Sequence, residues 1–171
     1  RGGADKLLIV QGALAGKTLA DVVGTRDPVQ AALDIVTSDD PDIISFNQSE
    51  RDITAFMRQP WVMTGSDASA GHPRMFGSFA RKYEVYVREQ RVIDLRQFIE
   101  RSSTLTARTF ALTGRGVLRR GAFADVVVFD PATYAARATY AAPTLTATGV
   151  RHVLVNGMLA VDAGRLTGAA A

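Results

Sequence analysis

Short aliphatic runs separated by helical patterns occupy the first two-thirds of the sequence, and this alternation constrains the fold most strongly. Leu7 to Val10 and Ile43 to Phe46 are continuous apolar runs, as expected of strands buried on both faces of a parallel sheet. Trp61 to Thr64 is a third such run, and a helical pattern separates it from the second. Strand, helix and strand in this order predict a βαβ unit.

Capping signals predict where the helices begin. Asp27 can cap a helix that has Pro28 in its first position, and Ser49 with Asp52 resembles a capping box before a helix that Pro60 ends. The apolar residues expected to form the packed face of the first helix are Val29, Ala32, Leu33 and Val36. The pattern is helical again from Asp94 to about Leu112, with a polar break at 102–104.

The final third has a different pattern and predicts antiparallel or mixed β structure. Ala124 to Phe129 is rich in β-forming residues, and Asn156-Gly157 joins Val153–Val155 to Met158–Val161 as a hairpin turn would. Residues 131–149 give little pattern and are interpreted as a connection. We therefore expect two parts, residues 1–113 and residues 114–171.

Composition excludes several classes of protein. A hydrophobic content of 47% is enough for a packed core, and no apolar run approaches the roughly 20 residues of a membrane span. The net charge of +3 comes from scattered charges, so we expect no nucleic-acid partner and interpret the mixed charges between Arg81 and Asp94 as a solvated helical surface. The lack of cysteine fits the cytoplasm, and the absence of an initiator Met suggests a fragment.

Asp67 is the main catalytic candidate. It follows Gly65 and Ser66 at the end of the third predicted strand, the edge at which parallel α/β folds place reacting groups. A carboxylate there could take a proton from a metal-activated water and pass it to a leaving amine. On spacing alone, Asp67 could equally cap the next turn.

Two further candidates follow Asp67 in the same loop. Arg74 has the planar fork that binds carboxylates, although a loop arginine is more often a surface residue. His72 is one of two histidines, and the other, His152, falls in the predicted hairpin and is interpreted as an ordinary strand residue. The two histidines lie too far apart to predict a zinc site, so any zinc ligands would come largely from outside this chain.

Three motifs resemble a known family. Residues 61–79, WVMTGSDASAGHPRMFGSF, are similar to the last barrel strand and following loop of N-acyl-D-amino-acid deacylases, the D-aminoacylases of the amidohydrolase superfamily. Residues 114–131, GRGVLRRGAFADVVVFDP, resemble the superfamily's return from barrel to small β-domain. Residues 149–168 resemble the final hairpin of that domain.

The resemblance implies a fold and a chemistry. It implies late βα units of a TIM barrel in residues 1–113, followed by part of a small β-sandwich in residues 114–171. It implies Asp67 as the proton carrier and possible metal ligand of a zinc-dependent hydrolase of N-acyl-D-amino acids. Arg74, His72 and Ser66 would bind the substrate, with Arg74 on its α-carboxylate. The remaining metal ligands have no counterpart here, so we expect the isolated chain to be inactive.

Two other functions stay open from the sequence. A cyclic amidase would share the barrel and the aspartate but open a ring amide. A non-catalytic β-rich assembly module would account for the absence of the part of the active site that binds the metal. Whatever the function, unpaired strand edges of the isolated chain predict a homo-oligomer or association with the missing half of the barrel.

Overall fold

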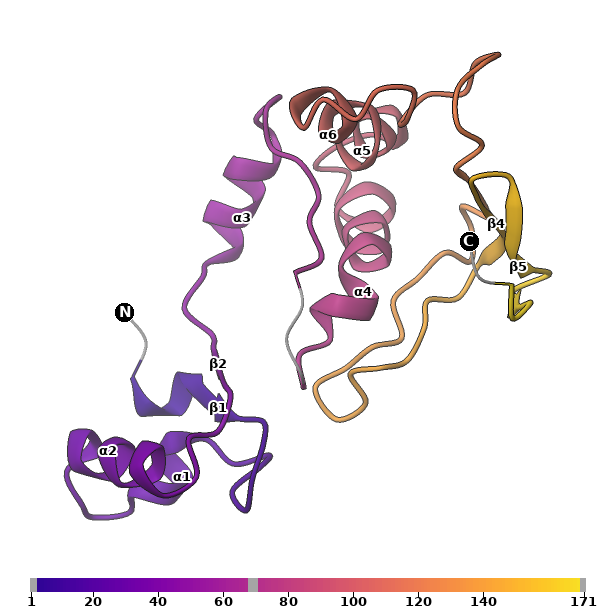
Figure 1. Ribbon diagram of the computed structural model, residues 1–171. Coiled ribbons are helices and arrows are strands. Elements are labelled where there is room, and N and C mark those ends of the chain that lie inside the picture. The colour runs from indigo at the N-terminus through magenta and orange to yellow at the C-terminus, as the bar shows by residue number, and fades with distance from the viewer. Residues whose placement is uncertain (1–2, 68–70, 170–171) are drawn as a thin grey trace.

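The computed structural model describes residues 3–67 and 71–169, which form a mixed α/β structure with antiparallel sheets. Figure 1 shows β1, β2, α1 and α2 together at one end of the molecule, with the remaining helices and the second sheet at the other. The elements of the first end are η1 (Ala4–Lys6), β1 (Leu7–Ile9), α1 (Leu19–Val23), α2 (Pro28–Ser38) and β2 (Ile43–Ser45). Those that follow are α3 (Glu50–Met57), α4 (Arg74–Arg81), η2 (Lys82–Glu89), α5 (Leu95–Ser102), α6 (Thr104–Thr109), β3 (Val126–Phe129), β4 (Val150–Val155), β5 (Met158–Asp162) and β6 (Arg165–Leu166). None of the described helices has the length and apolar character that a bilayer crossing requires.

β1 and β2 pair with each other, but the pairing is antiparallel, so the predicted parallel arrangement is wrong. Leu7 lies opposite Ser45 and Ile9 lies opposite Ile43. β2 buries only Ile44, whereas Ile43 is 43% exposed. A continuous aliphatic run does not show whether a strand is covered on one face or on both, and antiparallel strands tolerate a single covered face.

α2 begins where its capping signal predicts, because the Asp27 carboxylate accepts hydrogen bonds from the amides of Val29 and Gln30. The predicted packed face is wrong for Val29, Leu33 and Val36, whereas Ala32 is partly buried and packs against the core. α2 buries Ala31 and Ile35 against Ile9 of β1 and Leu19 and Val23 of α1. The exposed apolar side chains of α2 are Val29, Leu33 and Val36. Both faces of this helix carry apolar residues, so their spacing alone cannot show which face packs.

The predicted βαβ unit does not form within the described residues. α3 is capped by Ser49 as expected, with the Ser49 hydroxyl accepting from the Asp52 amide. Beyond Pro60, however, residues 61–64 form a turn and an extended segment that has no sheet partner in the described parts of the chain. The Val62 amide donates to the carbonyl of Gln59 and the Thr64 amide to that of Arg101, so these donors are bonded outside any ladder.

The helices after this segment form the second core. α4 continues directly into η2, a π-helix, and α5 is capped by Asp94 in a capping box with Gln97. The predicted break near 102–104 is confirmed by Ser103, which separates α5 from α6. The buried residues of this core are Met57, Tyr83, Tyr86, Ile93 and Phe98. Lys82 is only 7% exposed, so the prediction that it lies on a solvated surface is wrong.

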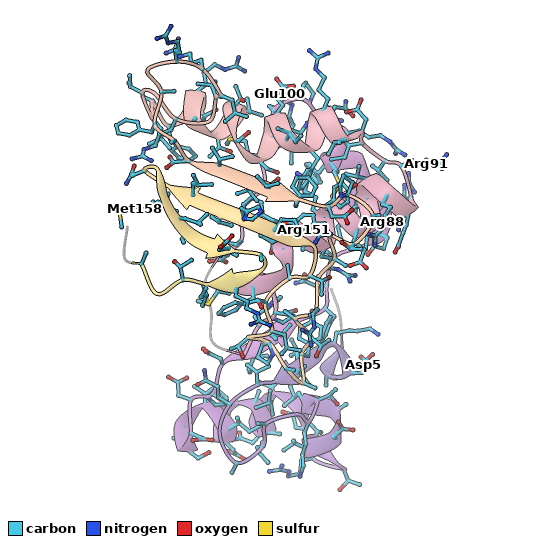
Figure 2. All side chains as sticks on the ribbon, turned by 90° about the vertical axis from the view of Figure 1, so that its right-hand side faces the viewer. Asp5, Arg88, Arg91, Glu100, Arg151 and Met158 are labelled. Atoms are coloured by element: carbon cyan, nitrogen blue, oxygen red, sulfur yellow. The ribbon has the colours of Figure 1, made fainter. Side chains whose placement is uncertain are left out.

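The four strands β3 to β6 form an antiparallel sheet in sequence order, as the final third of the sequence predicts. The hairpin turn is confirmed at Asn156 and Gly157, whose φ values of 51° and 83° are those of a type I′ turn. Figure 2 shows this sheet lying across the helices of the second core. Phe129 of β3 and Tyr134 contact Tyr83 of η2 with ring centroids 5.6 and 5.4 Å apart, which joins the sheet to the helices.

Candidate functional site

Asp67 lies in the extended segment that follows α3, and its carboxylate forms an ion pair with Arg74. Oδ2 of Asp67 lies 2.9 Å from Nη2 of Arg74. Asp67 has φ of 53°, a left-handed conformation that aspartate tolerates better than most residues. Because residues 61–67 form no strand, Asp67 does not lie at the end of a parallel strand as expected, and its position depends on the contacts of this segment.

Arg74 is the first residue of α4, and His72 shapes the chain just before it. Nδ1 of His72 accepts a hydrogen bond from the Arg74 amide at 3.0 Å. This bond satisfies one of the amides that a helix leaves without a partner in its first turn. His72 therefore acts as a cap for the helix that carries Arg74, and the sequence motif contained no signal for that role.

A cavity of about 380 Å³ lies beside the ion pair. Its lining residues come from the β1 and β2 region and from the start of α4: Val10, Asp42, Ile43, Ile44, Ser45, Asn47, His72 and Arg74. The structure thus brings His72 and Arg74 to one cavity, with Asp67 paired to Arg74 at its edge. Among the described residues, neither Ser66 nor Asp67 belongs to the lining.

Asp42 and Asn47 are members of this cavity that the sequence analysis missed. Asp42 accepts a hydrogen bond from Nε2 of Gln11 at 2.8 Å, and its backbone carbonyl accepts from the Val10 amide. Both residues flank the β2 strand, so correct pairing of β1 with β2 is needed before they can be placed near His72. The expected parallel arrangement did not predict that Asp42 and Asn47 lie near His72.

The electrostatics of the site favour a neutral His72. Burial lowers the pKa of its imidazole, the positive charge of Arg74 lowers it further, and Asp67 opposes the change. A neutral imidazole keeps Nδ1 available as the acceptor for the Arg74 amide. The cap on α4 therefore depends on the deprotonated form of His72.

The donor set for a metal is incomplete in the part of the chain that the structure describes. No group of three or more His, Cys, Asp or Glu side chains that could hold a metal ion occurs among residues 3–67 and 71–169. Asp67 could supply one ligand at most. His152 lies on β4, as predicted, and its Nδ1 is 3.0 Å from Oδ1 of Asp162 on β5, within the second sheet.

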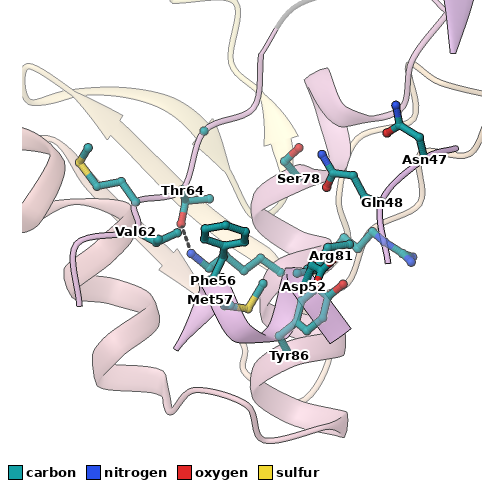
Figure 3. A pocket seen from close by; sticks show the side chains of 14 residues that line it. Asn47, Gln48, Asp52, Phe56, Met57, Val62, Thr64, Ser78, Arg81 and Tyr86 are labelled. Carbon is teal, nitrogen blue, oxygen red and sulfur yellow. Dashed lines mark hydrogen bonds between the residues drawn. The ribbon is translucent and has the colours of Figure 1, made fainter. Parts of the chain in front are cut away.

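A second cavity, of about 560 Å³, lies between α3, the extended segment and the α4 and η2 helices (Figure 3). Phe56 and Met57 of α3 contribute apolar surface to its lining, and Lys82 of η2 is another of its lining residues. Nζ of Lys82 donates to Oγ1 of Thr64 at 2.8 Å. The pKa of Lys82 is lowered to about 8, first by burial and then by the charge of Arg101.

Residues 25–161 match the protein family described as the Amidohydrolase family. An N-acyl-D-glutamate deacylase of Alcaligenes xylosoxydans xylosoxydans is 43% identical over 118 residues, which are 67% of this chain and 24% of the relative. A D-aminoacylase of the same organism is 38% identical over 149 residues, or 84% of this chain and 30% of the relative. The chain thus spans less than a third of the length of these relatives.

Solved structures agree with this similarity. An N-acyl-D-glutamate deacylase of Bordetella bronchiseptica, complexed with zinc and a phosphonate that mimics the tetrahedral intermediate, is 37% identical with a TM-score of 0.84. The alignment covers 95% of this chain and 37% of that one. A D-aminoacylase with a binuclear metal centre is 30% identical with a TM-score of 0.87, over 95% of this chain and 36% of that one.

Proposed function

The chain belongs to the Amidohydrolase family, and from this premise we propose that it is the C-terminal portion of a zinc-dependent hydrolase that cleaves the N-acyl amide bond of N-acyl-D-amino acids. The observation that carries the proposal is the ion pair between Asp67 and Arg74 at the edge of a cavity that Arg74 and His72 line. The similarity to deacylases named for acyl-D-glutamate and acyl-D-aspartate supports the choice of substrate class.

Asp67 is the proposed proton carrier. Its carboxylate takes a proton from the attacking water and later delivers it to the nitrogen of the leaving amine, which departs as the free D-amino acid. Zinc, held by ligands that the rest of the protein supplies, would lower the pKa of water and polarise the acyl oxygen. Asp67 is also available as one metal ligand.

Arg74 is the proposed clamp for the substrate α-carboxylate. A guanidinium carries five N–H donors, so its contact with Asp67 through Nη2 is compatible with binding a second carboxylate. His72 holds the first turn of α4, and Ser66 is proposed as a further substrate contact beside Asp67. This arrangement would place the carboxylate and the scissile amide of one substrate near the same pair of side chains.

We also propose the architecture of the intact protein. Residues 1–113 would supply late βα units of a barrel, and residues 114–171 would supply strands of a small β-sandwich. The support is structural similarity over 95% of this chain. In such a barrel, the extended residues 61–67 would gain the ladder partners that the described chain does not provide.

The direct test is an assay of the complete, zinc-loaded protein. N-acetyl-D-glutamate, N-acetyl-D-aspartate and N-acetyl-D-methionine would be compared with their L-enantiomers, and release of the free amine would be followed. We expect kcat/KM for at least one D-substrate to exceed that for its enantiomer by roughly a hundredfold or more. Opening of hydantoin or dihydropyrimidine rings without any N-acyl hydrolysis would instead establish a cyclic amidase.

The chain described here is proposed to act only in association. α2 exposes Val29, Leu33 and Val36 along one side, and Phe56 and Trp61 are 60% and 63% exposed. Apolar surface of this kind favours contact with another copy or with the rest of the protein. In sedimentation, the isolated chain is expected to associate and to carry no stoichiometric zinc. A monodisperse, zinc-bound monomer that hydrolyses amides would contradict this proposal.

A further inference from the structure

Thr64, three residues before Asp67, forms hydrogen bonds with two helices, η2 and α5. Its Oγ1 accepts a hydrogen bond from Nζ of Lys82 at 2.8 Å and lies 2.8 Å from Oγ of Ser102 (Figure 3 shows the Lys82 bond as a dashed line). Its amide donates to the carbonyl of Arg101 at 3.1 Å. Because residues 61–67 have no sheet ladder within the described part of the chain, these bonds anchor the segment that presents Asp67.

The two buried cations near Thr64 have different partners. Arg101, 5% exposed, donates from Nη1 to the carbonyl of Met57 and from Nη2 to that of Arg58, at the end of α3. The last carbonyls of a helix otherwise lack donors, so Arg101 has a clear structural role. Lys82 bonds instead to the neutral hydroxyl of Thr64.

Lys82 contributes little to the stability of the fold, although its side chain is buried. It is 7% exposed, and among residues 3–67 and 71–169 no carboxylate lies within ion-pair distance of it. Burying an ammonium opposite a neutral oxygen is less favourable than burying an apolar side chain of similar shape. The physical effect of Lys82 is therefore local: it restricts the Thr64 side chain and the backbone next to it.

We propose that Lys82 is a positioning residue, which acts through Thr64 to fix where residues 64–67 present the Asp67 carboxylate. Lys82 acts through its hydrogen bond to Thr64, which precedes Asp67 by three residues in the chain. The inference rests on the proposed function, because Lys82 is proposed to position Asp67, the proton carrier of that reaction. A small displacement of a catalytic group can lower turnover by orders of magnitude, which gives the contact its importance.

The test compares Lys82→Met with Lys82→Arg in the complete, zinc-loaded protein, with the exposed Lys17→Met as the matched control. We expect Lys82→Met to lower kcat roughly tenfold to a hundredfold with KM within about twofold. Its Tm should stay equal to or above the wild-type value, because a buried charge is removed. Lys82→Arg keeps a donor for Thr64 and should recover most of kcat.

Amide hydrogen exchange of residues 61–67 gives a measurement that does not depend on activity. Lys82→Met should speed exchange in this segment, whereas Lys17→Met should leave it unchanged. Unchanged exchange in Lys82→Met, or a fall in kcat that only follows a fall in Tm, would overturn the positioning role. A wild-type protein with no deacylase activity but faster exchange in Lys82→Met would overturn the proposed function alone.

Discussion

Arg74 and Asp67 face each other with Nη2 and Oδ2 2.9 Å apart. The two side chains are 39% and 69% exposed, so solvent screens their attraction and the pair contributes about 0–1 kcal/mol to folding. The contact is therefore important for the proposed site and not for the stability of the fold. It joins the proposed proton carrier to the proposed clamp for the substrate carboxylate, at the edge of one cavity.

Replacing Arg74 by lysine should weaken substrate binding more than turnover. Lysine keeps the positive charge but loses the planar fork, and a hydrogen bond to a charged group contributes about 1.5–3 kcal/mol. KM for an N-acetyl-D-amino acid is therefore expected to rise roughly tenfold to a hundredfold. Steady-state kinetics of Arg74→Lys measures this change, with the exposed Arg91→Lys as a control. Equal effects on the acid and on its uncharged α-amide would show that Arg74 does not bind the carboxylate.

Acidification should weaken the start of α4 through His72. The folded pKa of His72 is lowered below 6.5, chiefly by burial and then by Arg74, against the opposing effect of Asp67. The neutral imidazole of His72 therefore contributes to the free energy of unfolding in full above pH 6.5. This contribution is lost as the pH falls through the folded pKa. Protonation also removes Nδ1 as the acceptor for the Arg74 amide.

A nuclear magnetic resonance titration of the imidazole checks this prediction, and a midpoint at or above 6.5 would contradict it. His72→Asn provides a matched variant, because asparagine can accept from the amide two residues ahead without titrating. Its thermal stability should fall less between about pH 8 and pH 5 than that of the wild type.

Local capping and turn chemistry were predictable from the sequence. Asp27 and Ser49 begin their helices as expected, and Asn156-Gly157 forms the hairpin turn. Each of these features depends on residues within one turn of the chain. Nearby side chains and backbone amides therefore determine them whatever the rest of the molecule does.

Features that depend on distant partners were not predictable. The run from Trp61 to Thr64 has the composition of a strand but finds no ladder partner among the described residues. Lys82 lies in a stretch of mixed charges, and only the packing of α3 and α5 around η2 shows that it is buried. The cavity residues Asp42 and Asn47 were missed because the sequence did not predict the antiparallel pairing of β1 with β2.

Gly149 should tolerate no side chain. Its φ is 77°, and an added Cβ would overlap the backbone of Tyr134, which would have to shift to make room. Gly149→Ala is expected to lower the free energy of unfolding by about 2–4 kcal/mol, from backbone strain and overpacking together. Gly121→Ala separates the two effects, because Gly121 has φ of 80° with no atom within 4 Å of its Cβ position. Thermal or urea unfolding measures both, and equal losses would contradict the steric argument.

The kinetics of Asp67→Asn in the complete, zinc-loaded protein test the central claim most directly. The amide cannot carry the proton from water to the leaving amine, so kcat for an N-acetyl-D-amino acid should fall by roughly a hundredfold to ten-thousandfold. The exposed Glu100→Gln, which makes the same chemical change on α5, should keep wild-type turnover. Zinc content measured in parallel separates a lost proton carrier from a lost metal ligand. Turnover of Asp67→Asn equal to that of Glu100→Gln would contradict the assignment of Asp67 to the reaction.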